Sequence, residues 1–130
     1  MGKSRKELNN ISKVILESAI DVHRELGAGL LESVYETCLY TELSGRKLNV
    51  KTQVPVKINY KEKVLEADFR IDLLVENEIV IELKAVDNLL PVHEAQLLTY
   101  MKLNNSRLGF LINFNVVKLV DGFKRKVMNF

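Results

Sequence analysis

Apolar residues recur at three- and four-residue steps along the first part of the chain. This spacing predicts an amphipathic helix from Ser4 to Leu26 with one buried stripe, which Gly27 and Gly29 then end. A second helix is expected from about Leu30 to Leu43, closed by Ser44-Gly45. The apolar stripes consist of Leu8, Ile11, Ile15, Ala19, Val22 and Leu26 in the first helix, and of Leu31, Val34, Tyr35, Cys38 and Leu39 in the second.

After Arg46 the pattern changes to the alternation that is typical of β-strands. Pro55 favours an edge position for the first strand, because proline cannot donate to a central strand ladder. A polar turn is expected at residues 59–62, and a new strand resumes at Val64. The apolar positions of the first strand are Val50, Val54, Val56 and Ile58.

The rest of the chain alternates between helix and strand. Pro91 can begin a third helix that reaches Leu103, before Asn104-Asn105 breaks it. Leu108 to Phe114 is predicted to be an apolar strand, and Asp121-Gly122 suits the tight turn of a short terminal hairpin. This order of elements predicts an α/β domain with a mixed sheet.

Composition narrows the class of protein. The 130 residues, 47% of them hydrophobic, fit one compact domain over residues 1–130. No segment approaches the roughly 18 apolar residues that a membrane span needs, so we expect a soluble, cytoplasmic protein. The single cysteine, Cys38, and the two histidines exclude an internal disulfide and disfavour a structural zinc site. The net charge of +2 permits contact with a polyanion without indicating a dedicated nucleic-acid binder.

Two predicted strands, Phe69 to Val75 and Ile79 to Leu83, flank a turn at Glu76-Asn77-Glu78. The number of residues in that turn fixes which side chains share a face of the sheet. A three-residue turn places Val75 opposite Ile79, whereas a two-residue turn mixes charged residues into the apolar set. The longer turn gives a clean core face of Ile71, Leu73, Val75, Ile79, Ile81 and Leu83.

The same register gathers three charged residues on the opposite face. Asp72 then faces Glu82, and Lys84 lies two positions further along the same face. Neighbouring carboxylates repel each other unless a cation neutralises them, and oxygen ligands suit Mg²⁺ or Mn²⁺. The alternative is a solvent-exposed Glu-Lys surface on which Asp72 makes a cross-strand salt bridge.

Several ordered segments resemble those of the GxxExxY proteins, a family assigned to the PD-(D/E)xK nuclease superfamily. Its signature is matched by Gly29-Leu-Leu-Glu32-Ser-Val-Tyr35. The resemblance implies a restriction-endonuclease-like core, a mixed β-sheet flanked by helices. It continues through Ile71-Asp72-Leu-Leu-Val-Glu, Ile81-Glu82-Leu-Lys84-Ala, Glu94-Ala-Gln96-Leu-Leu-Thr-Tyr100 and Gly109-Phe-Leu-Ile-Asn113-Phe114.

The resemblance also implies a role for each site residue. Asp72 and Glu82 are expected to be the metal-binding carboxylates, with Lys84 as the catalytic lysine. Glu32 is expected to be a third acidic ligand, directly or through water. Gln96 is expected to line the same catalytic pocket and to contact the water, the metal or the phosphate. The implied cofactor is Mg²⁺ or Mn²⁺.

Without the resemblance, several of these residues have ordinary explanations. Glu32 is then a helix-surface glutamate, and Gln96 is a partly buried, hydrogen-bonded glutamine. Gly29 and Tyr35 are interpreted as structural, because glycine permits the bend between helices and tyrosine can bury its ring while its hydroxyl finds a partner.

Two functions follow from these patterns. The first is a metal-dependent nuclease that hydrolyses phosphodiester bonds of DNA or RNA. The alternative is a catalytically silent nuclease-like binding or assembly module in a larger nucleic-acid-processing or defence system. Nucleic acid is the expected partner and a membrane is not. A protein partner or a homodimer, formed through the edge strand near Val54, is left open.

Overall fold

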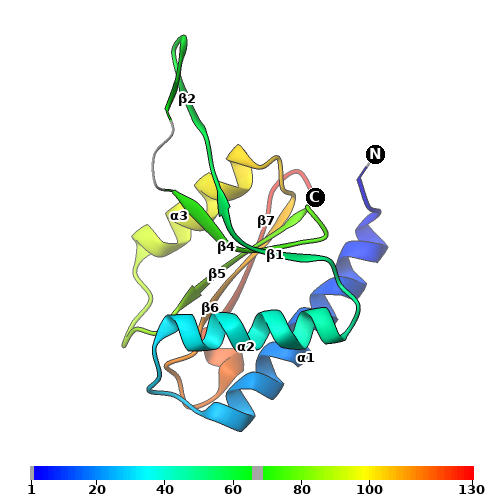
Figure 1. The fold of residues 1–130 in the computed structure, drawn as a ribbon, viewed down its shortest axis with the longest axis vertical. Coiled ribbons are helices and arrows are strands. Elements are labelled where there is room, and N and C mark those ends of the chain that lie inside the picture. The colour runs from blue at the N-terminus through cyan, green and yellow to red at the C-terminus, as the bar shows by residue number, and fades with distance from the viewer. Residues whose placement is uncertain (1, 66–68) are drawn as a thin grey trace.

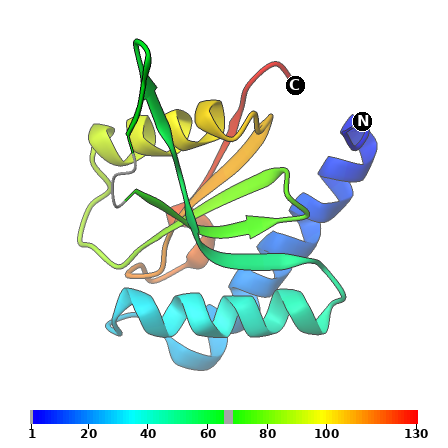
Figure 2. The same cartoon turned by 45° about the horizontal axis from the view of Figure 1, so that its top comes forward.

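The computed structural model describes residues 2–65 and 69–130. A five-stranded sheet separates α1 (Arg5–Leu26) and α2 (Glu32–Gly45) from α3 (Pro91–Leu103) (Figure 1). Figure 2 shows the same layers from a second direction, with α1 and α2 beneath the sheet and α3 above it. The predicted mixed α/β fold with helices flanking the sheet is confirmed. None of the helices among the described residues is long and apolar enough to cross a membrane.

The sheet has the strand order β1-β4-β5-β6-β7. β5 and β6 are parallel, and α3 supplies the crossover that parallel strands require. The other neighbouring pairs are antiparallel. Within the described sheet β1 pairs with β4 alone, so it lies at the edge, as Pro55 predicts. The strands are β1 (Val50–Pro55), β4 (Arg70–Val75), β5 (Ile79–Lys84), β6 (Leu108–Asn113) and β7 (Phe123–Val127).

The predicted first strand is divided in the structure. β1 ends at Pro55, and a separate hairpin of β2 (Ile58–Tyr60) and β3 (Lys63–Leu65) projects away from the sheet (Figure 1). The Val56 N–H donates to the Phe69 carbonyl oxygen at 2.8 Å. This bond closes the base of the projecting hairpin, next to the last pair of the β1–β4 ladder.

The connection to the last strand also differs from the expectation. Instead of a tight turn at Asp121-Gly122, a short 3-10 helix, η1 (Leu119–Gly122), leads into β7. Gly122 lies against the strand before it, because a Cβ at this position would be 2.2 Å from the Asn113 carbonyl oxygen. The close approach of the two backbones therefore explains the glycine.

Apolar clusters fill both faces of the sheet. Most of the predicted core face, from Leu73 to Leu83, packs against α1 and α2. Ile71 is the exception, because it packs in the cluster on the α3 side. Gln53, on the neighbouring strand, has φ 50°, which interrupts the alternation of β1 near Asp72. At this point the apolar side chains of both strands pass from the α1–α2 side of the sheet to the α3 side. The prediction that Ile71 shares the core face of Leu73 and Val75 is therefore wrong.

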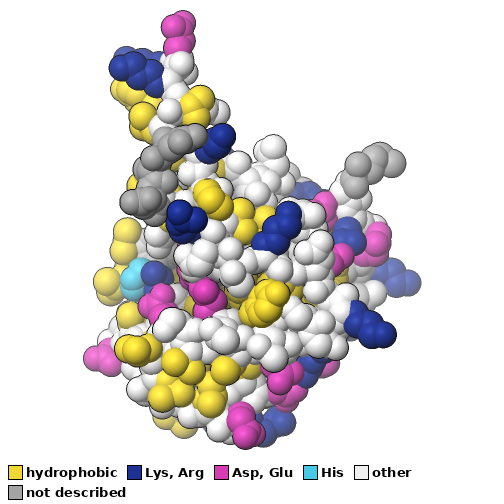
Figure 3. Space-filling view, viewed as in Figure 1, with side chains coloured by type: hydrophobic (Ala, Val, Ile, Leu, Met, Phe, Trp, Pro, Cys, Tyr) yellow, Lys and Arg dark blue, Asp and Glu magenta, His cyan; other side chains and the backbone are white. Residues whose placement is uncertain are grey.

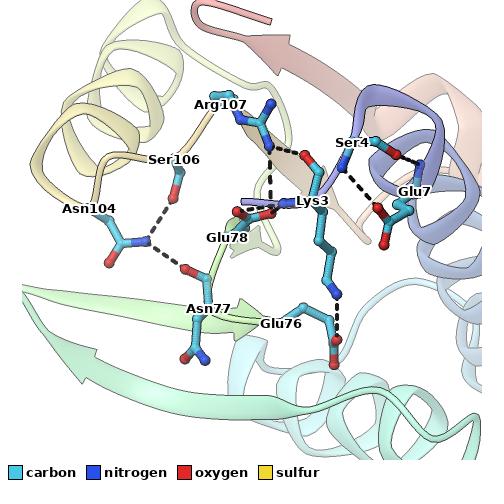
Figure 4. Close-up of polar contacts among 9 residues, drawn as sticks. All are labelled: Lys3, Ser4, Glu7, Glu76, Asn77, Glu78, Asn104, Ser106 and Arg107. Atoms are coloured by element: carbon cyan, nitrogen blue, oxygen red, sulfur yellow. Dashed lines mark hydrogen bonds and ion pairs between the residues drawn. The ribbon is translucent and has the colours of Figure 1, made fainter. Parts of the chain in front are cut away.

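The turn between β4 and β5 has the predicted three residues and is tied to the N-terminal segment (Figure 4). The Lys3 backbone N–H donates to both Glu78 carboxylate oxygens, at 3.1 and 3.2 Å. Lys3 Nζ lies 3.3 Å from Glu76 Oε1, and Arg107 lies 3.7 Å from Glu78. Glu76 and Asn77 both have positive φ, at 53° and 58°. These contacts hold the turn on which the hairpin register depends.

Tyr35 fixes the bend between α1 and α2. Its side chain is fully buried and its ring stacks on Phe114, with centroids 4.5 Å apart. The hydroxyl donates to the Gly27 carbonyl oxygen at 2.7 Å and accepts from the Leu30 N–H at 3.1 Å. Gly27 and Gly29 have positive φ, at 70° and 97°, which glycine adopts without strain. The structural interpretation of Gly29 and Tyr35 agrees with these contacts.

Replacement of Tyr35 by phenylalanine is expected to lower the free energy of unfolding by about 1–3 kcal/mol, because two backbone groups lose their partner. The control is Tyr40→Phe, since Tyr40 is 39% exposed. Chemical denaturation of both variants measures the difference. An equal effect of the two substitutions would contradict this role of the Tyr35 hydroxyl.

Candidate functional site

Asp72 and Glu82 lie side by side where β4 and β5 stop pairing through their backbones. The ladder extends from Val75 opposite Ile79 as far as Leu73 opposite Ile81. Beyond it, the Asp72 N–H donates to Glu82 Oε2 at 2.9 Å, and the Leu83 N–H donates to Asp72 Oδ2 at 2.8 Å. Each carboxylate therefore takes the place of a backbone acceptor on the facing strand.

Glu82 is an unusual carboxyl group because it is only 4% exposed. Burial, followed by the negative charge of Asp72, raises the pKa of Glu82 to about 9. The positive charge of Lys84 acts in the opposite direction and does not balance these effects. Without a further cation, Glu82 therefore carries a proton at neutral pH.

A carboxylate from α2 reaches this pair through a glutamine on β1. Gln53 Nε2 donates to Glu36 Oε1 at 2.7 Å and to Asp72 Oδ1 at 3.3 Å. Burial raises the pKa of Glu36, and the nearby carboxylates of Asp72 and Glu32 raise it further, against the hydrogen bond from Gln53. Sequence reasoning missed Glu36, although its spacing of one helical turn from Glu32 places both on one side of α2.

Glu32 is exposed in the first turn of α2, as its ordinary interpretation predicts. The structure brings Asp72 and Glu82 together. Glu36 is connected to Asp72 by the hydrogen bonds of Gln53, whereas Glu32 is exposed. Across residues 2–65 and 69–130, no group of three or more His, Cys, Asp or Glu side chains is arranged to hold a metal ion. The Glu36 carboxyl group thus lies near the Asp72–Glu82 pair, but the three described groups are not arranged to bind one metal ion.

On α3, Tyr100 lies near the carboxylates, and Gln96 is its hydrogen-bond partner. Gln96 Nε2 donates to the Tyr100 hydroxyl at 3.1 Å. Burial raises the pKa of Tyr100, and the charges of Glu82 and Asp72 contribute in the same direction. Gln96 is therefore held by Tyr100, a residue that the sequence analysis assigned no role.

The donor set suits a hard divalent cation. Glu82 and Asp72 each use one carboxylate oxygen, Oε2 and Oδ2, for a backbone N–H. Asp72 Oδ1 has a long 3.3 Å contact with Gln53. A divalent cation would offset the repulsion and the burial that keep Glu82 protonated, and Mg²⁺ and Mn²⁺ favour such oxygen ligands.

The fold and the site together define a class. A five-stranded mixed sheet covered by helices, with an acidic pair and a lysine on two adjacent strands, is consistent with a restriction-endonuclease-like core. The sequence profile of the PD-(D/E)XK nuclease superfamily matches residues 9–126. The chain belongs to this superfamily.

A solved structure supports the fold independently. The crystal structure of SSO0001 superimposes with a TM-score of 0.58 over 92% of this chain and 78% of that one. The two sequences are 19% identical, so the likeness concerns the fold. A search of curated proteins found no significant match.

The raised pKa of Glu82 predicts that the metal-free protein loses stability as the pH rises. Between the ordinary value of 4.5 and about 9, the folded state holds a proton that the unfolded chain releases. The free energy of unfolding therefore decreases as the pH rises through this window, by up to about 1.4 kcal/mol per pH unit. Thermal unfolding in EDTA at pH 5 to 9 measures this slope. Glu82→Gln is expected to flatten it, and an unchanged slope in that variant would contradict the assignment to Glu82.

Proposed function

We propose that this chain is a metal-dependent nuclease that hydrolyses phosphodiester bonds of DNA or RNA. The observation that carries the proposal is the Asp72–Glu82 pair, in which Glu82 is buried, with Lys84 two positions further along β5. A pair of carboxyl groups in such a place weakens the metal-free fold, which a purely structural role does not explain. The proposal includes membership of the GxxExxY branch, one domain over residues 1–130, and action in the cytoplasm.

Each side chain has a distinct role in this proposal. Asp72 and Glu82 hold Mg²⁺ or Mn²⁺, together with Glu32 or Glu36 from α2. When bound, the ion polarises a phosphoryl oxygen and lowers the pKa of a bound water. Lys84 orients the attacking water or stabilises the negative charge that develops on the phosphate.

Gln96 acts beside this pair. Its hydrogen bond orients the Tyr100 hydroxyl, and both groups line an open groove along α3. The amide of Gln96 retains a carbonyl oxygen that can accept from the attacking water. Gln96 therefore contributes to the position of the water or the phosphate, as the family resemblance implies.

Replacement of Asp72 by asparagine or of Lys84 by alanine is expected to lower cleavage by at least about a hundredfold. Asp72→Asn keeps an oxygen that can accept from the Leu83 N–H, so the fold is preserved. Lys118→Ala is the control, because Lys118 is exposed on the loop before η1. Cleavage of labelled DNA and RNA with Mn²⁺ measures the effect. Undiminished cleavage by both site variants would overturn the proposal.

The contact between Glu36, Gln53 and Asp72 predicts which α2 glutamate supports the metal. Glu36→Gln is expected to weaken Mn²⁺ binding by about 10- to 100-fold, whereas Glu32→Gln has a smaller effect. Calorimetric titration of both variants provides the comparison, with Glu42→Gln as a control on the same helix. A larger loss in Glu32→Gln would reverse the assignment in favour of the residue that the family resemblance implies.

A second candidate is a silent nuclease-like binding or assembly module. It is favoured by one observation, that the described acidic groups do not form a complete set of three metal ligands. The outer edge of β1 offers a surface for a protein partner or a second copy. Lack of Mn²⁺ binding at millimolar concentration, together with an intact fold, would favour this candidate over the nuclease.

A further inference from the structure

An open groove of about 380 Å³ lies between α3 and the base of the projecting β2–β3 hairpin. Ile58 and Phe69 form its hairpin side. Val92, Thr99 and Leu103 line it from α3, so most of its surface is apolar. Phe69, Val92 and Leu103 are all substantially exposed, at 42%, 64% and 38%. The groove therefore presents apolar side chains to solvent, and among them is an aromatic ring.

One residue of the groove, Tyr100, also lies near the candidate site. Gln96 and Tyr100 both line the groove, and Tyr100 lies close enough to Glu82 and Asp72 for their charges to raise its pKa. A molecule in the groove would thus contact Tyr100 and the Gln96 side chain that donates to its hydroxyl. Tyr100 therefore belongs to both surroundings, because it lines the groove and lies near the acidic pair.

The hairpin beside the groove carries cations and a second aromatic ring. Residues 57–65 include Lys57, Lys61 and Lys63 against a single acidic residue, Glu62. Tyr60 is 59% exposed, and Lys61 Nζ lies 5.4 Å from the centre of its ring. Figure 3 shows basic and hydrophobic side chains together on the projecting hairpin. Apolar and aromatic surface next to lysines matches the chemistry of a nucleotide, which combines a flat base with a phosphate.

We propose that the groove binds an unpaired base of a single-stranded nucleic acid, while the hairpin lysines contact its phosphates. A base offers its flat faces to apolar side chains only when it is not stacked in a duplex. The strand then passes Gln96 and Tyr100 toward Asp72 and Glu82. This inference rests on the proposed nuclease function and names its substrate class.

Binding is tested without cleavage, by fluorescence anisotropy in EDTA. A labelled single strand and a blunt duplex of the same sequence are titrated with the full chain. The single strand is expected to bind at least about tenfold more tightly, because stacking contributes to its affinity alone. Equal or weaker binding of the single strand, or no binding of either, would overturn the proposal.

Three variants locate the binding. Phe69→Ala removes the ring and is expected to weaken single-strand binding by about tenfold, whereas Phe69→Tyr restores it. Thr99→Trp, at an exposed position of α3, fills the groove and is expected to weaken binding further. Val117→Ala is the control, since Val117 is 94% exposed and does not line the groove. Wild-type affinity in both Phe69→Ala and Thr99→Trp would exclude the groove, and circular dichroism verifies that each variant is folded.

The two proposals fail in different ways. Asp72→Asn is expected to bind the single strand with unchanged or higher affinity, because it removes a negative charge without altering the groove. If the groove variants weaken single-strand binding but the wild-type protein cleaves no nucleic acid, the nuclease proposal is overturned and the single-strand site is retained. Cleavage that depends on Asp72, with no effect of Phe69→Ala or Thr99→Trp on binding, would overturn the groove and retain the nuclease.

Discussion

Asp72 and Glu82 each accept a hydrogen bond from the backbone of the other's strand, and the arrangement of the site depends on this exchange. The two bonds continue the contact between β4 and β5 after their backbone ladder has ended. They also bring two carboxyl groups together at a place where one of them is almost completely buried. The same contacts therefore join the strands and place two carboxyl groups where they repel each other when both are charged. A bound cation would relieve this repulsion.

The central hairpin was the most predictable part of the molecule. The length of its turn determines which face of the sheet each following side chain occupies, and only a three-residue turn places the apolar side chains on one face. Asp72 and Glu82 were placed opposite each other on this basis, and the structure brings them into contact. The first helix was also predictable, because its apolar period is long and Ser4 and Glu7 form a capping box at its start.

Other features depend on contacts that a linear pattern does not record. Ile71 packs on the α3 side of the sheet at the point where Gln53, distant in sequence, adopts a positive φ on the neighbouring strand. Glu36 escaped notice because its position near the acidic pair depends on a hydrogen bond from β1 to α2. The division of the first predicted strand depends on the closing bond between Val56 and Phe69. Each difference arises from a tertiary contact that overrides local alternation.

The projecting hairpin has a further consequence for how this fold can vary. Pro55 pairs with Arg70, and the bond from Val56 to Phe69 closes the ladder just beyond that pair. β1 and β4 therefore meet directly, so the chain between them is an insertion into an otherwise continuous hairpin. A segment attached in this way can be exchanged for one of another length or charge while the sheet and the acidic pair keep their register. Related chains could thus change the molecules that they recognise by changing the length or charge of the β2–β3 hairpin, while the packing of the core stays the same.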